Sequence, residues 1–124
     1  MFDLEEYQWK NRVLIIFTDS EDTPPFNAQM RILGEEKDGL LDRDLIIVEV
    51  LEKGNSRCGE IQIAAQAAEK LRKQFQVTPG LFQVLLLGKD GGIKLRRGEP
   101  VLAKDLFGII DSMPMRQQEM RRNN

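Results

Sequence analysis

The sequence predicts an α/β protein with a central four-stranded mixed β-sheet, in the order βαβ-α-ββ-α, and helices on both faces. Two buried, β-branched runs at residues 12–17 and 45–51 flank a helix-like segment, as in a parallel βαβ crossover. A third apolar run, residues 82–87, precedes an Asp90-Gly91 turn and an alternating strand at 93–96. Asp-Gly favours a tight hairpin because glycine accepts the positive φ that such turns need. These patterns predict a crossover and a hairpin within one sheet.

The composition fits one soluble domain spanning residues 1–124. A chain of this length is enough for one core and too short for two. The net charge of −2 offers no basic surface to nucleic acid, and no apolar run reaches the ~20 residues of a membrane span. The start of the chain is acidic, unlike a signal peptide, which favours a cytoplasmic location for the chain as given.

Two features of the residue inventory exclude classes of chemistry. The chain has no histidine, which excludes Ser-His-Asp and Cys-His catalysis and histidine-bound metal. It has one cysteine, Cys58, which excludes an intrachain disulfide and a CxxC pair. We therefore expect no metal and no cofactor.

The first half of the chain is predicted to hold a short segment, a strand, a helix and a second strand. Residues 4–11 form an amphipathic segment whose Tyr7 and Trp9 are expected to lie against the domain. The first strand ends at a loop of helix-capping residues and prolines, 18–25, and a helix follows to about Glu36. Apolar side chains recur on one face of that helix, at Phe26, Met30 and Leu33.

The second half is predicted to hold a loop, a helix, the hairpin, a last helix and a tail. Residues 54–59 are polar and are expected to be mobile. The clearest helix spans residues 61–75, and a last helix spans about 102–111. The first of these has an apolar stripe of Ile61, Ala64, Ala65, Ala68, Leu71 and Phe75, and the last should turn Leu102, Leu106, Ile109 and Ile110 inward. The tail, 113–121, carries charges and three methionines.

This order of elements is the thioredoxin-like layout. The crossover makes the first two strands parallel and adjacent, and the hairpin joins the sheet through its buried member. The predicted order is therefore hairpin edge, hairpin core, first strand, second strand. The charges of Lys94 and Arg96 should discourage the edge from pairing with another chain. A flavodoxin-like sheet would need another βα unit and a longer chain.

Four motifs together resemble a known family. They are Trp9-Lys10-Asn11-Arg12, Arg43-Asp44, LGKDGGIK at residues 87–94 and DSMPMRQQEMR at residues 111–121. The combination resembles the DUF4174 family, also described as the DUDES domain of animal sushi-repeat-containing, coiled-coil-domain and equarin-type extracellular matrix proteins. The resemblance spans nearly the whole chain and implies a thioredoxin-like fold, distantly related to peroxiredoxins, with no established biochemical activity. It also favours an exported, periplasmic or extracellular protein.

The resemblance to thioredoxin-like proteins implies a working site at the C-terminal end of the first strand. A thiol at that place has its pKa lowered by the dipole of the following helix. The resemblance puts the redox cysteines near Asp22 and Pro25 and a cis-proline near Gln83, but Asp22 and Pro25 are not cysteines and Gln83 is not a proline. We therefore expect no redox catalysis of the thioredoxin or peroxiredoxin kind.

The same end of the sheet offers polar candidates for binding. They are Asp19, Ser20, Asp22 and Thr23 in the loop, Gln83, and Arg96 and Arg97, which the hairpin returns to this end. The loop residues are expected to cap the helix, and cation binding is the weaker alternative because the calcium-loop spacing and its glycine are missing. The two arginines are expected to be solvated edge charges, with pairing to the acidic loop or binding of a small anion as alternatives.

Two further places carry alternatives. Cys58 is expected to be a structural thiol, and the alternative is a peroxidatic or intermolecular cysteine activated by Arg57. In the tail, Met113 is expected to pack on the domain, while Met115 and Arg116 are candidates for a patch that binds a partner. Arg116 and Arg121 could also form a local charge network with Glu119.

The sequence thus favours a non-catalytic thioredoxin-like domain that binds a protein or matrix partner of unknown identity. The alternatives are a thiol-dependent oxidoreductase or peroxidase using Cys58, and a small-anion-binding domain at the start of the first helix.

Overall fold

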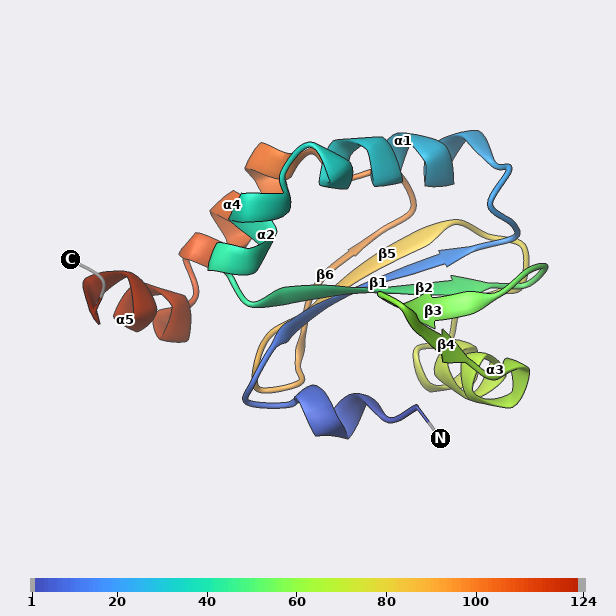
Figure 1. Ribbon diagram of the computed structural model, residues 1–124, viewed down its shortest axis with the longest axis horizontal. Coiled ribbons are helices and arrows are strands. Elements are labelled where there is room, and N and C mark those ends of the chain that lie inside the picture. The colour runs from blue at the N-terminus through green and yellow to red at the C-terminus, as the bar shows by residue number, and fades with distance from the viewer. Residues whose placement is uncertain (1, 123–124) are drawn as a thin grey trace.

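The computed structural model describes residues 2–122 as a central β-sheet covered by helices on both faces (Figure 1). Its strands are β1 (Arg12–Thr18), β2 (Leu45–Leu51), β3 (Ser56–Cys58), β4 (Ile61–Ile63), β5 (Gln83–Leu87) and β6 (Ile93–Arg97). Its helices are the 3₁₀ helix η1 (Leu4–Tyr7) and the α-helices α1 (Pro24–Gly34), α2 (Lys37–Asp42), α3 (Ala65–Gln74), α4 (Ala103–Asp111) and α5 (Pro114–Arg122). The strand order is β4-β3-β2-β1-β5-β6.

The four central strands confirm the thioredoxin-like α/β prediction. β1 pairs in parallel with β2 and antiparallel with β5, and β5 pairs antiparallel with β6. β6 is an edge of the sheet, as the hairpin pattern predicted. Between Leu86 and Leu87 the β5–β6 register shifts, because Leu86 lies opposite Leu95 and Leu87 opposite Ile93. Lys94 is the extra residue of this β-bulge.

The sheet has six strands rather than the predicted four, because a β3–β4 hairpin extends it beyond β2. The prediction of a loop over residues 54–59 is therefore wrong for residues 56–58, which form β3. The Ser56 Oγ accepts a hydrogen bond from the Leu51 N–H at 2.9 Å, which closes the turn between β2 and β3. Across the two strands, the Arg57 Nε donates to the Glu49 carboxylate at 3.3 Å.

Two apolar clusters fill the space on the two faces of the sheet. Side chains alternate along β1, so Val13, Ile15 and Phe17 pack toward η1 and α3. Leu14 and Ile16 pack toward α1, α2 and α4 on the other face (Figure 1). All residues of β1 are buried, which explains why the strand lacks the polar alternation of a half-exposed strand.

The helices depart from the prediction mainly at their ends. α1 ends at Gly34, and α2 is a separate helix. α3 begins at Ala65 because the preceding residues 61–63 pair with β3 as a strand. The buried side chains of α3 are Ala67, Ala68 and Leu71, with Phe75 directly after it, whereas Ile61, Ala64 and Ala65 are exposed. The predicted stripe is therefore wrong at its start and correct at Ala68, Leu71 and Phe75.

α4 turns Leu106 and Ile110 into the core, as predicted, but Leu102 precedes the helix and is 54% exposed. The expectation that Trp9 lies against the domain is also wrong, because its side chain is 62% exposed. Within residues 2–122, every helix is too short or too polar to cross a membrane.

Candidate functional site

The loop after β1 uses its hydroxyl groups internally. The Thr18 Oγ1 lies 2.9 Å from the Thr23 Oγ1 and donates to the Ser20 carbonyl oxygen at 3.1 Å. The Asp22 N–H donates to the Ser20 Oγ at 3.2 Å. The Asp19 carboxylate lies 3.6 Å from the Lys53 ammonium. The side chains in this place form a closed turn without a thiol.

Thr23 stands at the cap position of α1 but does not cap the helix. Its hydroxyl points back to Thr18 and to Ser20, and α1 begins with Pro24 and Pro25. Proline has no N–H, so two of the donors that a capping side chain or a bound anion would use are missing. The expected capping role is therefore not realised by Thr23.

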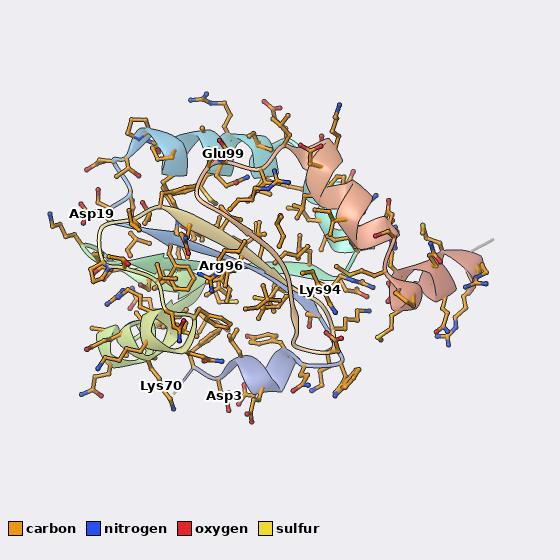
Figure 2. All side chains as sticks on the ribbon, turned by 180° about the vertical axis from the view of Figure 1, so that it is seen from behind. Asp3, Asp19, Lys70, Lys94, Arg96 and Glu99 are labelled. Atoms are coloured by element: carbon orange, nitrogen blue, oxygen red, sulfur yellow. The ribbon has the colours of Figure 1, made fainter. Side chains whose placement is uncertain are left out.

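Arg96 of β6 makes its side-chain hydrogen bonds away from the acidic loop. The Arg96 guanidinium donates to the Gln83 Oε1 and to the Phe75 carbonyl oxygen, both at 2.7 Å. Gln83 lies opposite Phe17 in the β1–β5 pairing, and Arg97 lies opposite Val84. Figure 2 shows Asp19 and Arg96 well apart, so the cation and the loop carboxylate do not form one site.

Cys58 lies in β3 and is only 7% exposed. It packs within the apolar cluster on the α3 face. Burial raises the pKa of the Cys58 thiol; a hydrogen bond with Tyr7 opposes this shift, and the charge of Glu49 adds to it. Arg57, the residue expected to activate the thiol, is instead bonded to Glu49. This environment favours the neutral thiol.

The conspicuous charged site lies at the opposite end of β1. We call it the ion-pair cluster: Arg12, Arg43, Lys89, Arg116, Asp42, Asp44, Asp111 and Glu119. Each of the four sequence motifs supplies at least one member of this cluster. Four cations and four carboxylates meet here, so the cluster is formally neutral.

Glu119 joins α5 to the start of β1 and to the hairpin turn. Its two carboxylate oxygens accept from Arg12 Nη1 and Nη2, each at 3.1 Å, and one also accepts from Lys89 Nζ at 2.8 Å. Arg12 is fully buried, and Lys89 is also bonded to Asp44 at 2.9 Å. Burial acts to raise the pKa of Glu119, but the hydrogen bonds from Arg12 and Lys89 outweigh it and hold that pKa below its ordinary value.

Arg116 joins α5 to α2 and α4. Its Nη2 lies 2.6 Å from the Asp42 carboxylate, and its Nε lies 3.0 Å from the Asp111 carboxylate. Asp111 also accepts two hydrogen bonds from Arg43, whose guanidinium stacks on the Phe107 ring at 3.9 Å. Arg116 is the buried residue of α5, so its ion pairs help to hold this helix. The sequence-based candidate Arg116 thus lies inside the cluster rather than on a free surface.

A groove opens beside the cluster, between the residues before β1, the β5–β6 turn and the α4–α5 connection. We call it the Trp9 groove, and its volume is about 640 Å³. Its apolar lining is Trp9, Ile93, Ile109, Met113, Pro114 and Met115, and its polar side chains are Arg12, Lys89, Asp90, Lys94 and Ser112. Met115 was a candidate from sequence, whereas Trp9, Ile93 and Ile109 were not. Their juxtaposition depends on the tertiary fold.

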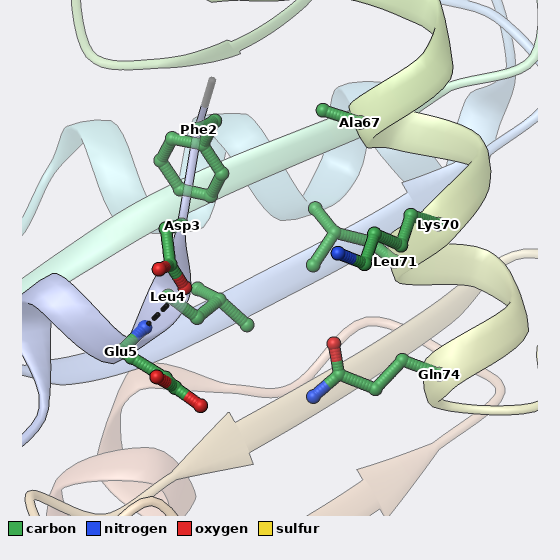
Figure 3. Close-up of a pocket in the computed structure, with 8 residues that line it drawn as sticks. All are labelled: Phe2, Asp3, Leu4, Glu5, Ala67, Lys70, Leu71 and Gln74. Atoms are coloured by element: carbon green, nitrogen blue, oxygen red, sulfur yellow. Dashed lines mark hydrogen bonds between the residues drawn. The ribbon is translucent and has the colours of Figure 1, made fainter.

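A second hollow lies between η1 and α3, with a volume of about 490 Å³ (Figure 3). Phe2, Leu4 and Leu71 form apolar walls, and Lys70 stands at the rim on α3. The Asp3 carboxylate there accepts the Glu5 N–H at 3.0 Å and so caps η1. This hollow also contains no thiol.

Relatives identified by sequence comparison are much longer than this chain. Coiled-coil domain-containing protein 80 of Danio rerio is 26% identical over 133 aligned residues, which cover 94% of this chain and 15% of that protein. Sushi repeat-containing protein SRPX2 of Homo sapiens is 28% identical over 120 residues, covering 94% of this chain and 26% of that protein. The chain therefore spans about a quarter or less of the length of these relatives.

Solved structures with a similar fold include a peroxiredoxin. Reduced 2-Cys peroxiredoxin of Plasmodium vivax aligns with a TM-score of 0.69 at 13% identity, covering 94% of this chain and 85% of that one. StoA from Bacillus subtilis aligns with a TM-score of 0.55 at 16% identity, covering 80% and 81%. At such identities the likeness establishes the fold alone.

The model of one protein family, described as a domain of unknown function (DUF4174), matches residues 3–119. That range includes all members of the ion-pair cluster, the first three motifs and residues 111–119 of the fourth motif. The chain belongs to the DUF4174 family, and its fold is thioredoxin-like.

Proposed function

We propose that this domain is a non-catalytic thioredoxin-like module that binds a protein partner. The observation that carries the proposal is the chemistry of the loop after β1. At the place where a thioredoxin-like enzyme holds its reactive thiol, residues 19–25 supply carboxylates, hydroxyls and prolines. A thiol-based reaction needs a thiolate nucleophile, and none of these side chains can form one.

Cys58 is poorly suited to take over that role. The thiolate is the reactive form, and burial of Cys58 raises its pKa, so little thiolate is present near neutral pH. The fold shared with peroxiredoxins is compatible with thiol chemistry, but the burial of this side chain disfavours it. The small-anion alternative is weakened by Pro24 and Pro25, which lack N–H donors at the start of α1.

The relatives support a binding role. In the zebrafish and human proteins the matched region is a minor part of a longer chain. This is the arrangement expected of a module that works beside other domains. The resemblance to domains of extracellular matrix proteins favours a protein of the matrix as the partner.

The test is a direct assay of thiol chemistry on the purified domain and on its Cys58→Ser variant. We expect both proteins to reduce insulin disulfides and to consume hydrogen peroxide, with dithiothreitol as reductant, no faster than buffer alone. A rate above the buffer rate that disappears in Cys58→Ser would overturn the proposal. A thioredoxin assayed in parallel establishes that the conditions support turnover.

A further inference from the structure

We infer that α5 is a detachable helix: it opens from the domain as one unit while the sheet and the other helices stay folded, and acid promotes this opening. Such a helix is a switch built into the fold, because its opening exposes charged groups that the closed domain buries. Three observations support the inference: α5 lies outside the apolar core, two charged side chains make its hydrogen bonds to the domain, and its connection to α4 allows it to move alone.

The apolar core is complete without α5. Among the residues that the structure describes, neither apolar cluster includes a side chain of this helix. Arg116 is the buried residue of α5, and Met115 keeps 37% of its surface exposed. In Figure 1, α5 lies at one end of the molecule, whereas α1, α3 and α4 cover the faces of the sheet. Opening of α5 would therefore leave both apolar clusters intact.

Two side chains of α5 make its hydrogen bonds to the rest of the domain. Among residues 2–122, every hydrogen bond that joins α5 to another helix, strand or turn involves Arg116 or Glu119. Their partners are Arg12 in β1, Asp42 at the end of α2, Lys89 in the β5–β6 turn and Asp111 at the end of α4. Each of these ion pairs requires a deprotonated carboxylate, so the docking of α5 depends on pH.

The connection between α4 and α5 consists of Ser112 and Met113. The Met113 N–H donates to the Ile110 carbonyl oxygen at 3.0 Å and the Ser112 Oγ donates to the Ile109 carbonyl oxygen at 2.7 Å, so α4 completes its last turn without α5. Met113 packs against the apolar cluster beside α4, and Pro114, which has no N–H, begins α5. The chain can therefore pivot after Met113 without breaking a hydrogen bond of α4.

The closed arrangement leaves one buried group unsatisfied. Arg12 is fully buried, and within the described residues its Nε lacks a hydrogen-bond partner. When Glu119 departs with α5, water can take its place beside the Arg12 guanidinium. Solvation of a buried cation offsets part of the ion pair that is lost. The opening thus exposes Arg12 together with Arg116, which is also buried in the closed domain.

A released α5 should also unfold. The helix has nine residues, and an isolated helix shorter than about 12–15 residues is marginal in water. Release therefore removes the protection of its backbone amides against hydrogen exchange, which makes the opening measurable.

Acid acts on the carboxylates of the ion pairs. Cations surround the two that matter most: Arg12, Lys89 and Arg116 face Glu119, while Arg43 and Arg116 face Asp111. The remaining carboxylates of the cluster, Asp42 and Asp44, each share one of these cations. Burial acts to raise the pKa values of Glu119 and Asp111, but hydrogen bonds from the cations outweigh it and hold both values below the ordinary range. Docking is therefore complete above about pH 5 and is lost as the pH falls through the folded-state pKa values.

Hydrogen exchange of single amides, followed by ¹H–¹⁵N NMR at pH 7 in urea concentrations below the unfolding transition, tests the inference. The amides of residues 118–122 report on α5, and those of residues 14–16 report on β1. We expect the α5 amides to share one opening that is at least about tenfold more frequent than that of β1 and that depends weakly on urea. Equal protection and equal urea dependence would show that α5 unfolds only with the sheet, and would overturn the inference.

One variant and its control test whether the ion pairs hold α5. Glu119→Gln should speed exchange of the α5 amides at least about tenfold, because it removes the counter-charge of the buried Arg12. Glu69→Gln alters an exposed pair with Lys73 and should leave that exchange within about twofold of the unmodified domain. Equal rates in the two variants would contradict the role of the cluster.

The effect of acid is measured on the unmodified domain. Protection of the α5 amides, relative to their intrinsic exchange rates, should fall at least about tenfold between pH 7 and pH 3, while the β1 amides keep their native peak positions. Loss of α5 and β1 in a single step would overturn the inference. No part of this test depends on the reactivity of Cys58, so it and the thiol assays can fail separately.

Discussion

Replacement of Glu119 by glutamine tests whether charge holds α5 to the rest of the domain. The carboxylate accepts two hydrogen bonds from Arg12 and one from Lys89, and Arg12 is fully buried. In Glu119→Gln one oxygen becomes an NH₂ group that faces a cation, and Arg12 loses its counter-charge. Lys89 keeps its contact with Asp44.

The size of the effect follows from burial. Breaking a fully buried ion pair costs about 3–5 kcal/mol, and a hydrogen bond to a charged group contributes about 1.5–3 kcal/mol. The Glu119 side chain is 20% exposed, so water compensates part of the loss. We expect Glu119→Gln to lower the free energy of unfolding by about 2–3 kcal/mol, or Tm by about 10 °C for a domain of this size.

The assay is urea and thermal unfolding followed by far-UV circular dichroism. The matched control is Glu69→Gln, which alters an exposed pair with Lys73 whose side chains are 59% and 78% exposed. That control should change the free energy of unfolding by less than about 0.5 kcal/mol. If Glu119→Gln and Glu69→Gln behave alike, the cluster does not stabilise the fold and the reasoning is refuted.

The same cluster predicts acid sensitivity. The pKa values of Glu119 and Asp111 are held below their ordinary values because, in each case, hydrogen bonds from cations outweigh the opposing effect of burial. Their contribution to stability is therefore complete above about pH 5 and is lost as the pH falls through the folded-state pKa values. The stability difference between the unmodified domain and Glu119→Gln should shrink from pH 7 to pH 3, as measured by urea unfolding. A constant difference would contradict this linkage.

Three further predictions concern single positions. Gly39→Ala should destabilise the domain by about 1–3 kcal/mol, because the new Cβ would lie 2.8 Å from the Phe107 ring. Gly108→Ala has open space around it and should stabilise α4 by roughly 0.5–1 kcal/mol. Thermal unfolding of both variants checks the contrast. Cys58 should react slowly with a thiol reagent at pH 8 in the folded domain and rapidly in guanidinium, and equal rates would contradict its burial. Trp9→Asn should leave the free energy of unfolding unchanged or raise it by up to about 1 kcal/mol, because asparagine tolerates positive φ and the indole is exposed. Urea unfolding measures this change. A loss above about 1 kcal/mol would show that the indole supports the fold.

The central strands were predictable because their signals are local. The buried run of β1 and the Asp90-Gly91 turn each determine structure within a few residues, so the pairing of β1, β2, β5 and β6 followed from their order. β3 and β4 have three residues each and follow a Gly54-Asn55 turn signal. These short strands form because β3 can pair with the free edge of β2 and β4 can then pair with β3. Their own sequences do not predict them.

The sites were less predictable because they depend on distant partners. The sequence marked Arg116 and Glu119 as parts of a specific motif, but Glu119 meets Arg12 across a separation of 107 residues. No local periodicity encodes that contact. Likewise, the exposure of Trp9 follows from a left-handed backbone held by the hairpin turn, which the apolar character of the residue does not indicate.

The most direct test of the account measures hydrogen peroxide consumption by the purified domain and by its Cys58→Ser variant, with dithiothreitol as reductant. The account predicts that both proteins leave the rate at that of buffer alone, because the loop after β1 has no thiol and Cys58 is buried. A rate above that of buffer that is lost in Cys58→Ser would contradict it.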